Sequence, residues 1–342
     1  MTPSPPNRRE FLQAGAAGIA ATGLAGAASQ DANQAAQKNS GGVPLRPLGK
    51  TGQNVSLLCL GGHASTNPNK MEEKESLRLI QRAVDEGITF MDNCWDYHDG
   101  LAEARMGKAL AEGGRRDKVF LMTKVCGRSA RDAQSNLEES LSRLKTDHID
   151  LWQFHEMVYD NDPDWVFAAD GAIHTGLKAL KDGKVRFLGF TGHKDPIIHL
   201  KMLGMPFDWA AVQMPLNVMD VHYRSFQKQV LPVLLQRNIG VLGMKSLGGS
   251  GNIVTHAGVP VEDALRYVLS LPISTSYPGS TRKGARPEPQ DRPRVQAADG
   301  GRADADRAVH PQGRRRRPVR AVRRPRPTAL HRRQHGFDTE IS

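Results

Sequence analysis

Residues 119–155 read VFLMTKVCGRSARDAQSNLEESLSRLKTDHIDLWQFH, and this stretch decides the fold class. It opens and closes on short apolar runs, Val119–Thr123 and Ile149–Phe154, which are typical of buried strands. The segment between them carries leucines at the spacing of one helix face: Leu137, Leu141 and Leu144. A strand, a helix and a second strand in this order indicate two parallel strands joined by a crossover helix.

The same alternation continues along most of the chain. Apolar runs whose starts lie 24 to 36 residues apart occur at Val55–Leu60, Thr89–Met91, Val119–Thr123, Ile149–Phe154, Val185–Phe190, Trp209–Gln213 and Gly240–Met244. Helix-like stretches separate the runs, and several end at glycines such as Gly87 and Gly183. With an eighth strand near Ile273, the pattern predicts an α/β fold, a (βα)₈ TIM barrel over residues 43–275.

A doubly wound open sheet is the alternative fold. That fold would place a G-x-G-x-x-G motif after its first strand, and Gly61-Gly62-His63-Ala64 does not supply one. Composition sets further limits, because 39% hydrophobic residues in a chain of 342 exclude wholesale disorder. The three cysteines lie far apart, which argues against a disulfide scaffold and a cysteine zinc site. No apolar run reaches the roughly 18–20 residues of a membrane span, so we expect no stable membrane insertion.

The N-terminus has the pattern of an export signal. Arg8 and Arg9 precede a small, weakly apolar stretch from Ala14 to Ala28, and Ala25-Gly26-Ala27 has the form of a cleavage site. We therefore predict a twin-arginine signal peptide at residues 1–28, a linker at 29–42, the twin-arginine translocase as a partner and a periplasmic location. A short amphipathic N-terminal helix is the alternative.

Four polar residues stand where apolar strands stop. Asp92, Lys124 and His155 end the second, third and fourth runs, and Tyr97 follows in the second loop. Sites of this fold form at the carboxyl ends of the strands, so the four side chains can converge. A tyrosine hydroxyl is a weak acid whose pKa a nearby Lys⁺ lowers, an aspartate can hold the lysine, and a histidine can orient a carbonyl. This combination indicates proton transfer coupled to carbonyl reduction.

Several segments resemble the aldo-keto reductase family. They are MDNCWDYHDGLAEARMGKAL (91–110), LMTKV (121–125), DLWQFHE (150–156), GFTGHKDP (189–196), VQMPLNVMD (212–220) and GVLGMKSLGGSG (240–251). The resemblance runs from about Leu45 to about Pro272. It implies reduction of an aldehyde or ketone by a catalytic tetrad of Asp92, Tyr97, Lys124 and His155, with Tyr97 as the general acid.

The resemblance also implies a nicotinamide cofactor, usually NADPH (NADP) with NAD possible. Thr191 and Gln213 would meet the nicotinamide amide, although Thr191-Gly192-His193 stands where Ser-Asn is usual. The residues expected to approach the pyrophosphate are Met244, Lys245, Ser246, Leu247 and Gly248. No metal is expected, because no local spacing supports a cluster of His155, His193 and Glu156. A disulfide between Cys94 and Cys126, two residues past Asp92 and Lys124, stays open beside two reduced thiols.

The last 67 residues differ from the rest of the chain. Residues 276–342 hold 16 arginines and one lysine against seven acids, which is +10 of the total +11. They hold eight prolines and only eight of Val, Ile, Leu, Phe and Tyr, too little apolar surface to offset the entropy of ordering. Arg314–Arg317 and Arg320–Arg326 could contact phosphates, but no aromatic residue is interleaved, so we expect a disordered tail and no nucleic-acid partner.

This tail has the composition of G+C-rich DNA read in the wrong frame. Back-translated and shifted by one base, Gly284–Ala298 can give VLDQNLKIARGFKP, and Gly313–Arg324 can give VAAAVPFELYD, which resemble the family's eighth helix and C-terminus. We predict a frameshift between Thr275 and Lys283, an incomplete eighth βα unit with an open barrel edge, and weak NADPH affinity. Pro278–Arg282 would retain part of the phosphate site. A catalytically impaired barrel that binds a ligand or partner is then the alternative function.

Overall fold

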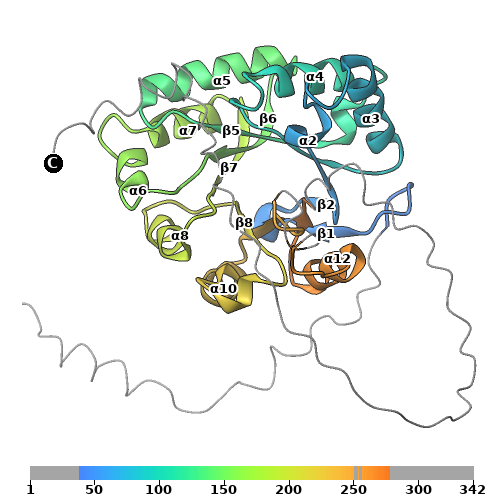
Figure 1. Cartoon of the computed structure of the whole chain (residues 1–342). Helices are drawn as coiled ribbons and strands as arrows, with labels where there is room; N and C mark the ends of the chain where they lie inside the picture. Colours follow the sequence, from blue (N-terminus) through green and yellow to red (C-terminus); the bar gives the residue numbers. More distant parts are fainter. Residues whose placement is uncertain (1–37, 250–252, 254–255, 278–342) are drawn as a thin grey trace, which may run out of the picture. The chain divides into compact units, whose positions relative to one another are not determined.

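Eight parallel strands form the centre of the computed structural model, which describes residues 38–249, 253 and 256–277 (Figure 1). In sheet order from one end they are β3 (Cys59–Gly61), β4 (Phe90–Asp92), β5 (Phe120–Val125), β6 (Ile149–Phe154), β7 (Val185–Thr191), β8 (Ala211–Pro215), β9 (Gly240–Met244) and β10 (Thr275–Ser276). Each strand pairs in parallel with the next strand along the chain. The (βα)₈ barrel expected from the sequence is confirmed.

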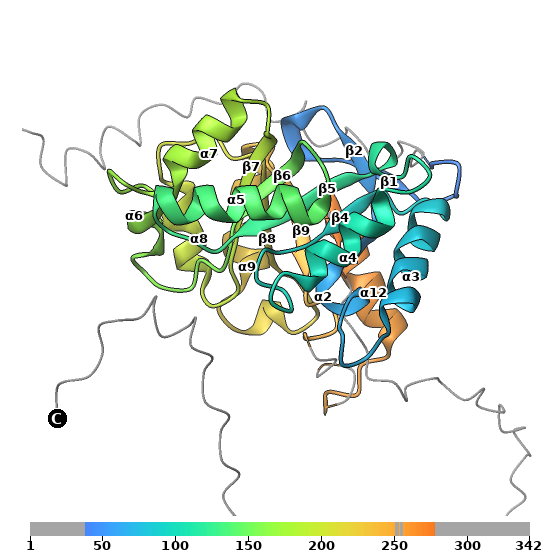
Figure 2. The same ribbon diagram turned by 90° about the horizontal axis from the view of Figure 1, so that it is seen from above.

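Helices surround the strands, as Figures 1 and 2 show from two directions. They are α2 (Gly62–Ser65), α3 (Glu73–Asp85), α4 (Leu101–Leu110), α5 (Ala130–Leu144), α6 (Asp162–Val166), α7 (Ala172–Lys181), α8 (Pro196–Leu203), α9 (Phe226–Gln229), α10 (Leu231–Gln236) and α12 (Val261–Ser270). In α5 the Ser129 side chain caps the first turn by accepting the Asp132 N–H at 3.1 Å. Leu137 and Leu144 are buried on its inner face, as their spacing predicts.

Side chains alternate between the inside of the barrel and the layer under the helices. Phe90, Phe120, Met122 and Leu151 belong to one apolar cluster, whereas their neighbours Met91, Leu121 and Trp152 belong to the other. The Phe90 and Phe120 rings stack inside the barrel with centroids 5.4 Å apart. Because strand side chains repeat every two residues, Asp92 and Lys124 share the inward side with Phe90 and Met122.

An antiparallel hairpin that the sequence pattern did not separate precedes the barrel. The run expected as one strand, Val55–Leu60, is divided between β2 (Asn54–Ser56) and β3, and β2 pairs with β1 (Leu45–Pro47). Leu48 and Val55 pack into the inner apolar cluster, and the Lys50 N–H donates to the Asn238 carbonyl at 2.8 Å, just before β9 begins. The hairpin thus covers the amino ends of the strands, opposite the polar residues.

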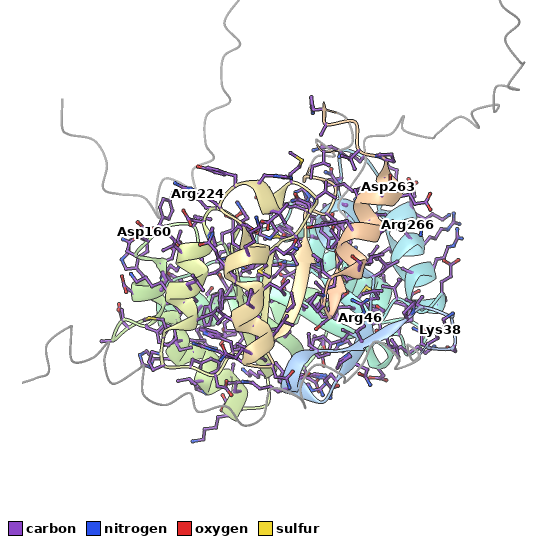
Figure 3. All side chains as sticks on the ribbon, turned by 90° about the horizontal axis from the view of Figure 1, so that it is seen from below. Lys38, Arg46, Asp160, Arg224, Asp263 and Arg266 are labelled. Atoms are coloured by element: carbon purple, nitrogen blue, oxygen red, sulfur yellow. The ribbon has the colours of Figure 1, made fainter. Side chains whose placement is uncertain are left out.

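The eighth strand is short, but it joins the first. The Ser276 N–H donates to the Leu57 carbonyl at 2.9 Å, and Ser276 forms a parallel bridge with Leu58. The eighth strand has only two residues, as expected for an incomplete eighth unit, but one bridge connects the two ends of the sheet, so the barrel is nearly closed at this edge rather than open. Arg46, labelled in Figure 3, holds the preceding segment by donating to the carbonyls of Leu269, Leu271 and Ile273 at 2.8–3.0 Å.

The predicted signal peptide, most of the linker and the tail after Tyr277 lie outside the described residues. The expectations for those segments, including the frameshift and the retained phosphate site at residues 278–282, stay predictions. Among the residues that the structure describes, no helix is long and apolar enough to span a bilayer.

Candidate active site

The four residues expected to carry the chemistry meet at the carboxyl ends of the strands. Lys124 lies at the centre: its Nζ donates to Asp92 Oδ1 and to the Asn93 carbonyl, the latter at 2.6 Å. The Tyr97 hydroxyl lies 3.5 Å from the same Nζ. Gln213 donates to the second oxygen of Asp92 at 2.7 Å, so both carboxylate oxygens are engaged. Asp92 and Lys124 are buried, with 4% and 1% exposure.

The pKa of Tyr97 differs from the expectation that the nearby lysine would lower it. Burial raises the pKa of the Tyr97 hydroxyl well above its ordinary value, and although Lys124 lowers this pKa as expected, the effect of burial is larger. Burial alone would lower the pKa of Lys124, but the Asp92 carboxylate beside it counters this effect, and the pKa of Lys124 is raised. Tyr97 is therefore held protonated beside a permanent ammonium, which suits a proton donor rather than a resident tyrosinate.

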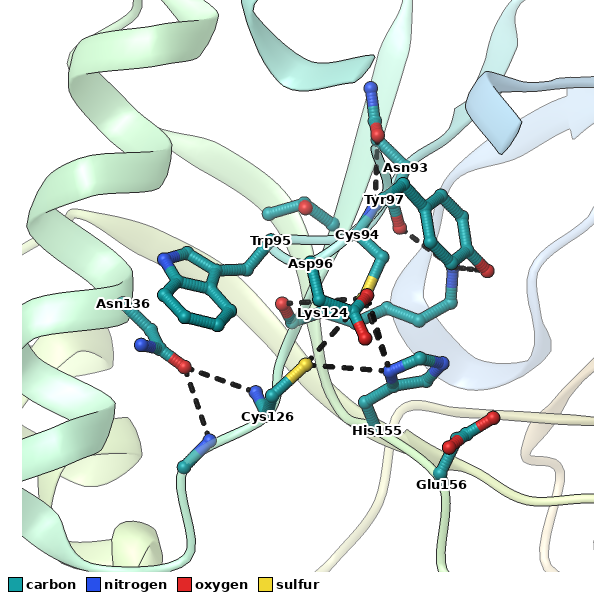
Figure 4. Close-up of polar contacts among 12 residues, drawn as sticks. Asn93, Cys94, Trp95, Asp96, Tyr97, Lys124, Cys126, Asn136, His155 and Glu156 are labelled. Carbon is teal, nitrogen blue, oxygen red and sulfur yellow. Dashed lines mark hydrogen bonds and ion pairs between the residues drawn. The ribbon is translucent and has the colours of Figure 1, made fainter. Parts of the chain in front are cut away.

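His155 follows β6 and contacts Tyr97 edge to face, with ring centroids 5.9 Å apart. Its main chain is fixed from both sides, since its N–H donates to the Val125 carbonyl at 2.9 Å and its carbonyl accepts from Arg128 at 2.8 Å. Figure 4 shows Nδ1 turned toward two sulfur atoms, with the other ring nitrogen on the opposite side of the ring.

The sulfur atoms belong to Cys94 and Cys126, which are free thiols with Sγ atoms 3.9 Å apart. Nδ1 of His155 lies 3.1 Å from Cys94 Sγ and 3.5 Å from Cys126 Sγ. Contact with Cys94, followed by the effect of His155, lowers the pKa of Cys126 to about 7, whereas burial raises the pKa of Cys94. From the equivalent places of the two cysteines, the sequence left open a disulfide or two reduced thiols, and the structure has two free thiols. The contact of both sulfurs with His155 was not expected.

His155, His193 and Glu156, the cluster considered from the sequence, do not form one group in the structure. His193 Nε2 pairs with Glu156 Oε1 at 3.0 Å, and this contact lowers the pKa of Glu156 to about 2. His155, in contrast, joins the two cysteines.

The residues expected to hold a nucleotide fall into two groups. Thr191 and Gln213 are buried register partners on β7 and β8. Met244 ends β9, and a turn follows in which Lys245, Gly248 and Gly249 have positive φ angles of 58°, 81° and 70°.

In that turn the side chains of Ser246 and Leu247 are buried, and Ser246 Oγ lies 2.9 Å from Ser276 Oγ. The side chains of Ser246 and Leu247 therefore cannot contact a ligand. Lys245 is half-buried, and burial lowers its pKa. A lysine on a glycine-rich turn of this kind fits a phosphate group, so the residues present suit the nucleotide that the resemblance implies.

The sequence did not single out a buried side-chain amide that lies beside Lys124, that of Gln153. Gln153 is 0% exposed, lies beside Lys124 in the β5–β6 register, and neither its Nε2 nor its Oε1 has a hydrogen-bond partner among the described residues. Its position two residues after the inward Leu151 was the available signal.

The fold and the site together define a barrel protein with a buried Asp–Lys pair beside a half-buried tyrosine at the carboxyl ends of its strands. The model of the aldo/keto reductase family matches residues 57–256, and the chain belongs to this family. Among curated proteins it is similar to the uncharacterized oxidoreductase YrpG of Bacillus subtilis, with 30% identity over 224 residues, 59% of this chain and 66% of that protein. The aldo-keto reductase YhdN of the same organism is 30% identical over 212 residues, which cover 58% of this chain and 61% of the relative. The chain thus spans less than two thirds of the length of either relative.

A solved structure, a putative aldo-keto reductase from Pseudomonas aeruginosa, has a TM-score of 0.58 at 24% identity. The match covers 69% of this chain and 88% of that one. At this level of identity the likeness shows the fold alone.

Proposed function

We propose that the protein reduces an aldehyde or ketone with a nicotinamide cofactor, NADPH in the first place, and that Tyr97 is the proton donor. The observation that carries the proposal is the chain of contacts from Gln213 through the buried Asp92 and Lys124 to the hydroxyl of the half-buried Tyr97. Family membership supports the reaction class.

The cofactor would supply a hydride to the carbonyl carbon. Lys245 and the turn after β9 would hold its phosphates, and Thr191 and Gln213 would lie at its nicotinamide end. Tyr97 holds a proton at its hydroxyl and passes it to the carbonyl oxygen as that oxygen gains negative charge. Lys124 lies 3.5 Å away and stabilises the tyrosinate left behind, while Asp92 keeps the ammonium in place. His155 would donate from Nε2 to the carbonyl oxygen.

The direct test combines nucleotide binding with turnover. Fluorescence titration of the purified mature chain with NADPH and NADH is followed by a panel of aldehydes and ketones, monitored by loss of reduced-nucleotide absorbance. The variant Tyr97→Phe should lose roughly 10²–10⁴-fold in reduction rate and keep its nucleotide affinity. Full activity in this variant contradicts the role of Tyr97, and nucleotide binding without turnover of any carbonyl by the parent favours a binding barrel.

We further propose that the twin-arginine pathway exports the protein to the periplasm, on the basis of Arg8, Arg9 and the weakly apolar stretch behind them. Replacing both arginines by lysine should keep the chain in the cytoplasm with an uncleaved N-terminus. Fractionation and N-terminal mass measurement check this. Unchanged periplasmic recovery from cells that lack the translocase would rule the pathway out.

A frameshift between Thr275 and Lys283 is the third proposal, and it predicts that the chain as written binds NADPH weakly. Two experiments test it. The gene is resequenced, and NADPH affinity is measured for the chain with the present sequence (the literal chain) and for a chain with the reading frame restored. The frame-restored chain should bind more tightly. Tight binding by the literal chain, together with resistance of residues 284–342 to proteolysis, would show that the tail is a genuine part of the protein.

A further inference from the structure

Four potential metal ligands from three separate segments converge beside the proposed active site. They are the sulfurs of Cys94 and Cys126, Nδ1 of His155 and a carboxylate oxygen of Asp96, and all four atoms lie within 4.8 Å of one another. Cys94 and Asp96 belong to the segment after β4, Cys126 follows β5, and His155 follows β6 (Figure 4). We propose that this cluster is a binding site for a divalent zinc ion.

The separations among the two sulfurs and Nδ1 are close to those of a tetrahedral zinc site. With zinc–sulfur bonds of about 2.3 Å and zinc–nitrogen bonds of about 2.0 Å, two sulfurs lie about 3.8 Å apart and a sulfur and a nitrogen about 3.5 Å apart. The structure has 3.9 Å between the sulfurs, and 3.1 and 3.5 Å from the sulfurs to Nδ1. The Asp96 oxygen lies 3.9 Å from Nδ1. A metal at the centre therefore requires adjustments of about half an ångström among the sulfurs and Nδ1. The exposed Asp96 carboxylate has to move further, because the four atoms are spread over up to 4.8 Å.

The donor set favours zinc among the common metals. Two thiolates, an imidazole and a carboxylate are ligands that zinc accepts, and sulfur ligands disfavour calcium and magnesium. Cys94 and His155 are buried, whereas the side chain of Asp96 is 43% exposed, so the carboxylate is the ligand on the solvent side.

The main chain that carries the ligands is held independently of any metal. The side-chain oxygen of Asn136 accepts the N–H groups of Cys126 and Gly127, both at 3.1 Å. Asn93 accepts the Cys94 N–H through its side-chain oxygen at 2.8 Å. These hydrogen bonds fix the main chain at both cysteines, so their sulfurs are held in place before a metal binds.

Zinc at Nδ1 would have a consequence for His155. A neutral imidazole bound through Nδ1 carries its proton at Nε2, so that nitrogen becomes a fixed hydrogen-bond donor. This consequence rests on the proposed carbonyl reductase function, in which Nε2 orients the substrate, but the metal site itself does not depend on it.

A disulfide between the same cysteines is the competing outcome. A disulfide needs sulfurs about 2.05 Å apart, so the two atoms would have to approach by almost 2 Å and could no longer both bind a metal. Counting thiols in the full chain, isolated without reductant and then chelated and denatured, separates the two. Three titratable thiols support the metal site, and a single thiol from Cys59 overturns it.

The decisive measurement is metal content without substrate or nucleotide, so its result is independent of the reductase proposal. The full chain, reduced, stripped with a chelator and dialysed against zinc, should retain one equivalent by mass spectrometry. With cobalt it should show the d–d bands of a tetrahedral site and a sulfur-to-cobalt charge-transfer band.

Cys126→Ser, at the half-buried position, should lose both signals, and Cys94→Ser should lose them as well. Asp96→Asn should weaken binding without abolishing it, because water can replace an exposed ligand. Cys59→Ala is the matched control and should keep one equivalent, since Cys59 lies on β3 outside the cluster. Absence of zinc in the parent chain, or zinc content unaffected by both serine variants, overturns the proposal.

Discussion

Replacing Lys124 by methionine removes the buried ammonium that lies between Asp92 and Tyr97. Methionine has a similar length, so the change deletes the charge more than the volume. The Asp92 carboxylate, 4% exposed, then keeps its bond from Gln213 but has lost its counter-charge. Breaking a buried pair by removing one partner costs about 3–5 kcal/mol. For a domain of this size that corresponds to a fall in Tm of roughly 6–20 °C.

Chemical unfolding of four proteins tests the reasoning: the parent, Lys124→Met, Asp92→Asn and the double variant. The double variant leaves no charge buried at this place, so it should be more stable than Lys124→Met. Arg82→Met is the control, because the Arg82–Glu86 pair is largely exposed and its loss should leave the unfolding midpoint almost unchanged. A coupling below about 0.5 kcal/mol between Lys124 and Asp92 would refute the claim that they act as one desolvated pair.

The same variant affects the chemistry through Tyr97. Without Lys124, the group that lowers the pKa of Tyr97 is gone, and burial raises that pKa without opposition. In the proposed reaction Tyr97 ends as a tyrosinate, so carbonyl reduction should slow. The reverse oxidation of an alcohol should reach its plateau at a higher pH than in the parent. An unchanged pH profile of alcohol oxidation would show that Lys124 does not act on Tyr97.

Three further predictions concern stability. Burial lowers the pKa of His199 to about 4, below its ordinary value of about 6.5. The unfolded chain therefore takes up a proton that the folded chain does not, and stability falls by up to roughly 3 kcal/mol as pH drops from ~6.5 toward ~4. In His199→Gln the urea midpoint of unfolding should vary less with pH over this range, and the same pH dependence as in the parent would contradict the prediction. Arg46→Met deletes three donor contacts to carbonyls before β10 and should cost about 1.5–3 kcal/mol in chemical unfolding, with faster proteolysis after α12. Gly107→Ala would place a Cβ 2.3 Å from the Arg143 carbonyl oxygen where α4 meets α5, and should lower thermal stability by about 1–3 kcal/mol.

Local sequence patterns were enough to predict the barrel and the candidate residues of the site. Strand and helix patterns repeat along the chain, and the polar residues of the site lie at the carboxyl end of an apolar strand or just beyond it. Because strand side chains alternate and parallel strands end at one edge, Asp92 and Lys124 had to face inward at the same end. These inferences need only local periodicity and one rule of topology, which is why they could be made without coordinates.

The properties that depend on distances across the barrel and on exclusion of water could be established only from the folded structure. Local spacing suggests no metal site, because the ligands Cys94, Cys126 and His155 come from three different strand ends, and only the strand register brings them within bonding range of one ion. The pKa of Tyr97 rises rather than falls because burial, which has no sequence signature, outweighs the nearby charge of Lys124. In both cases the physical cause is an environment assembled from distant segments, which the order of residues along the chain does not display.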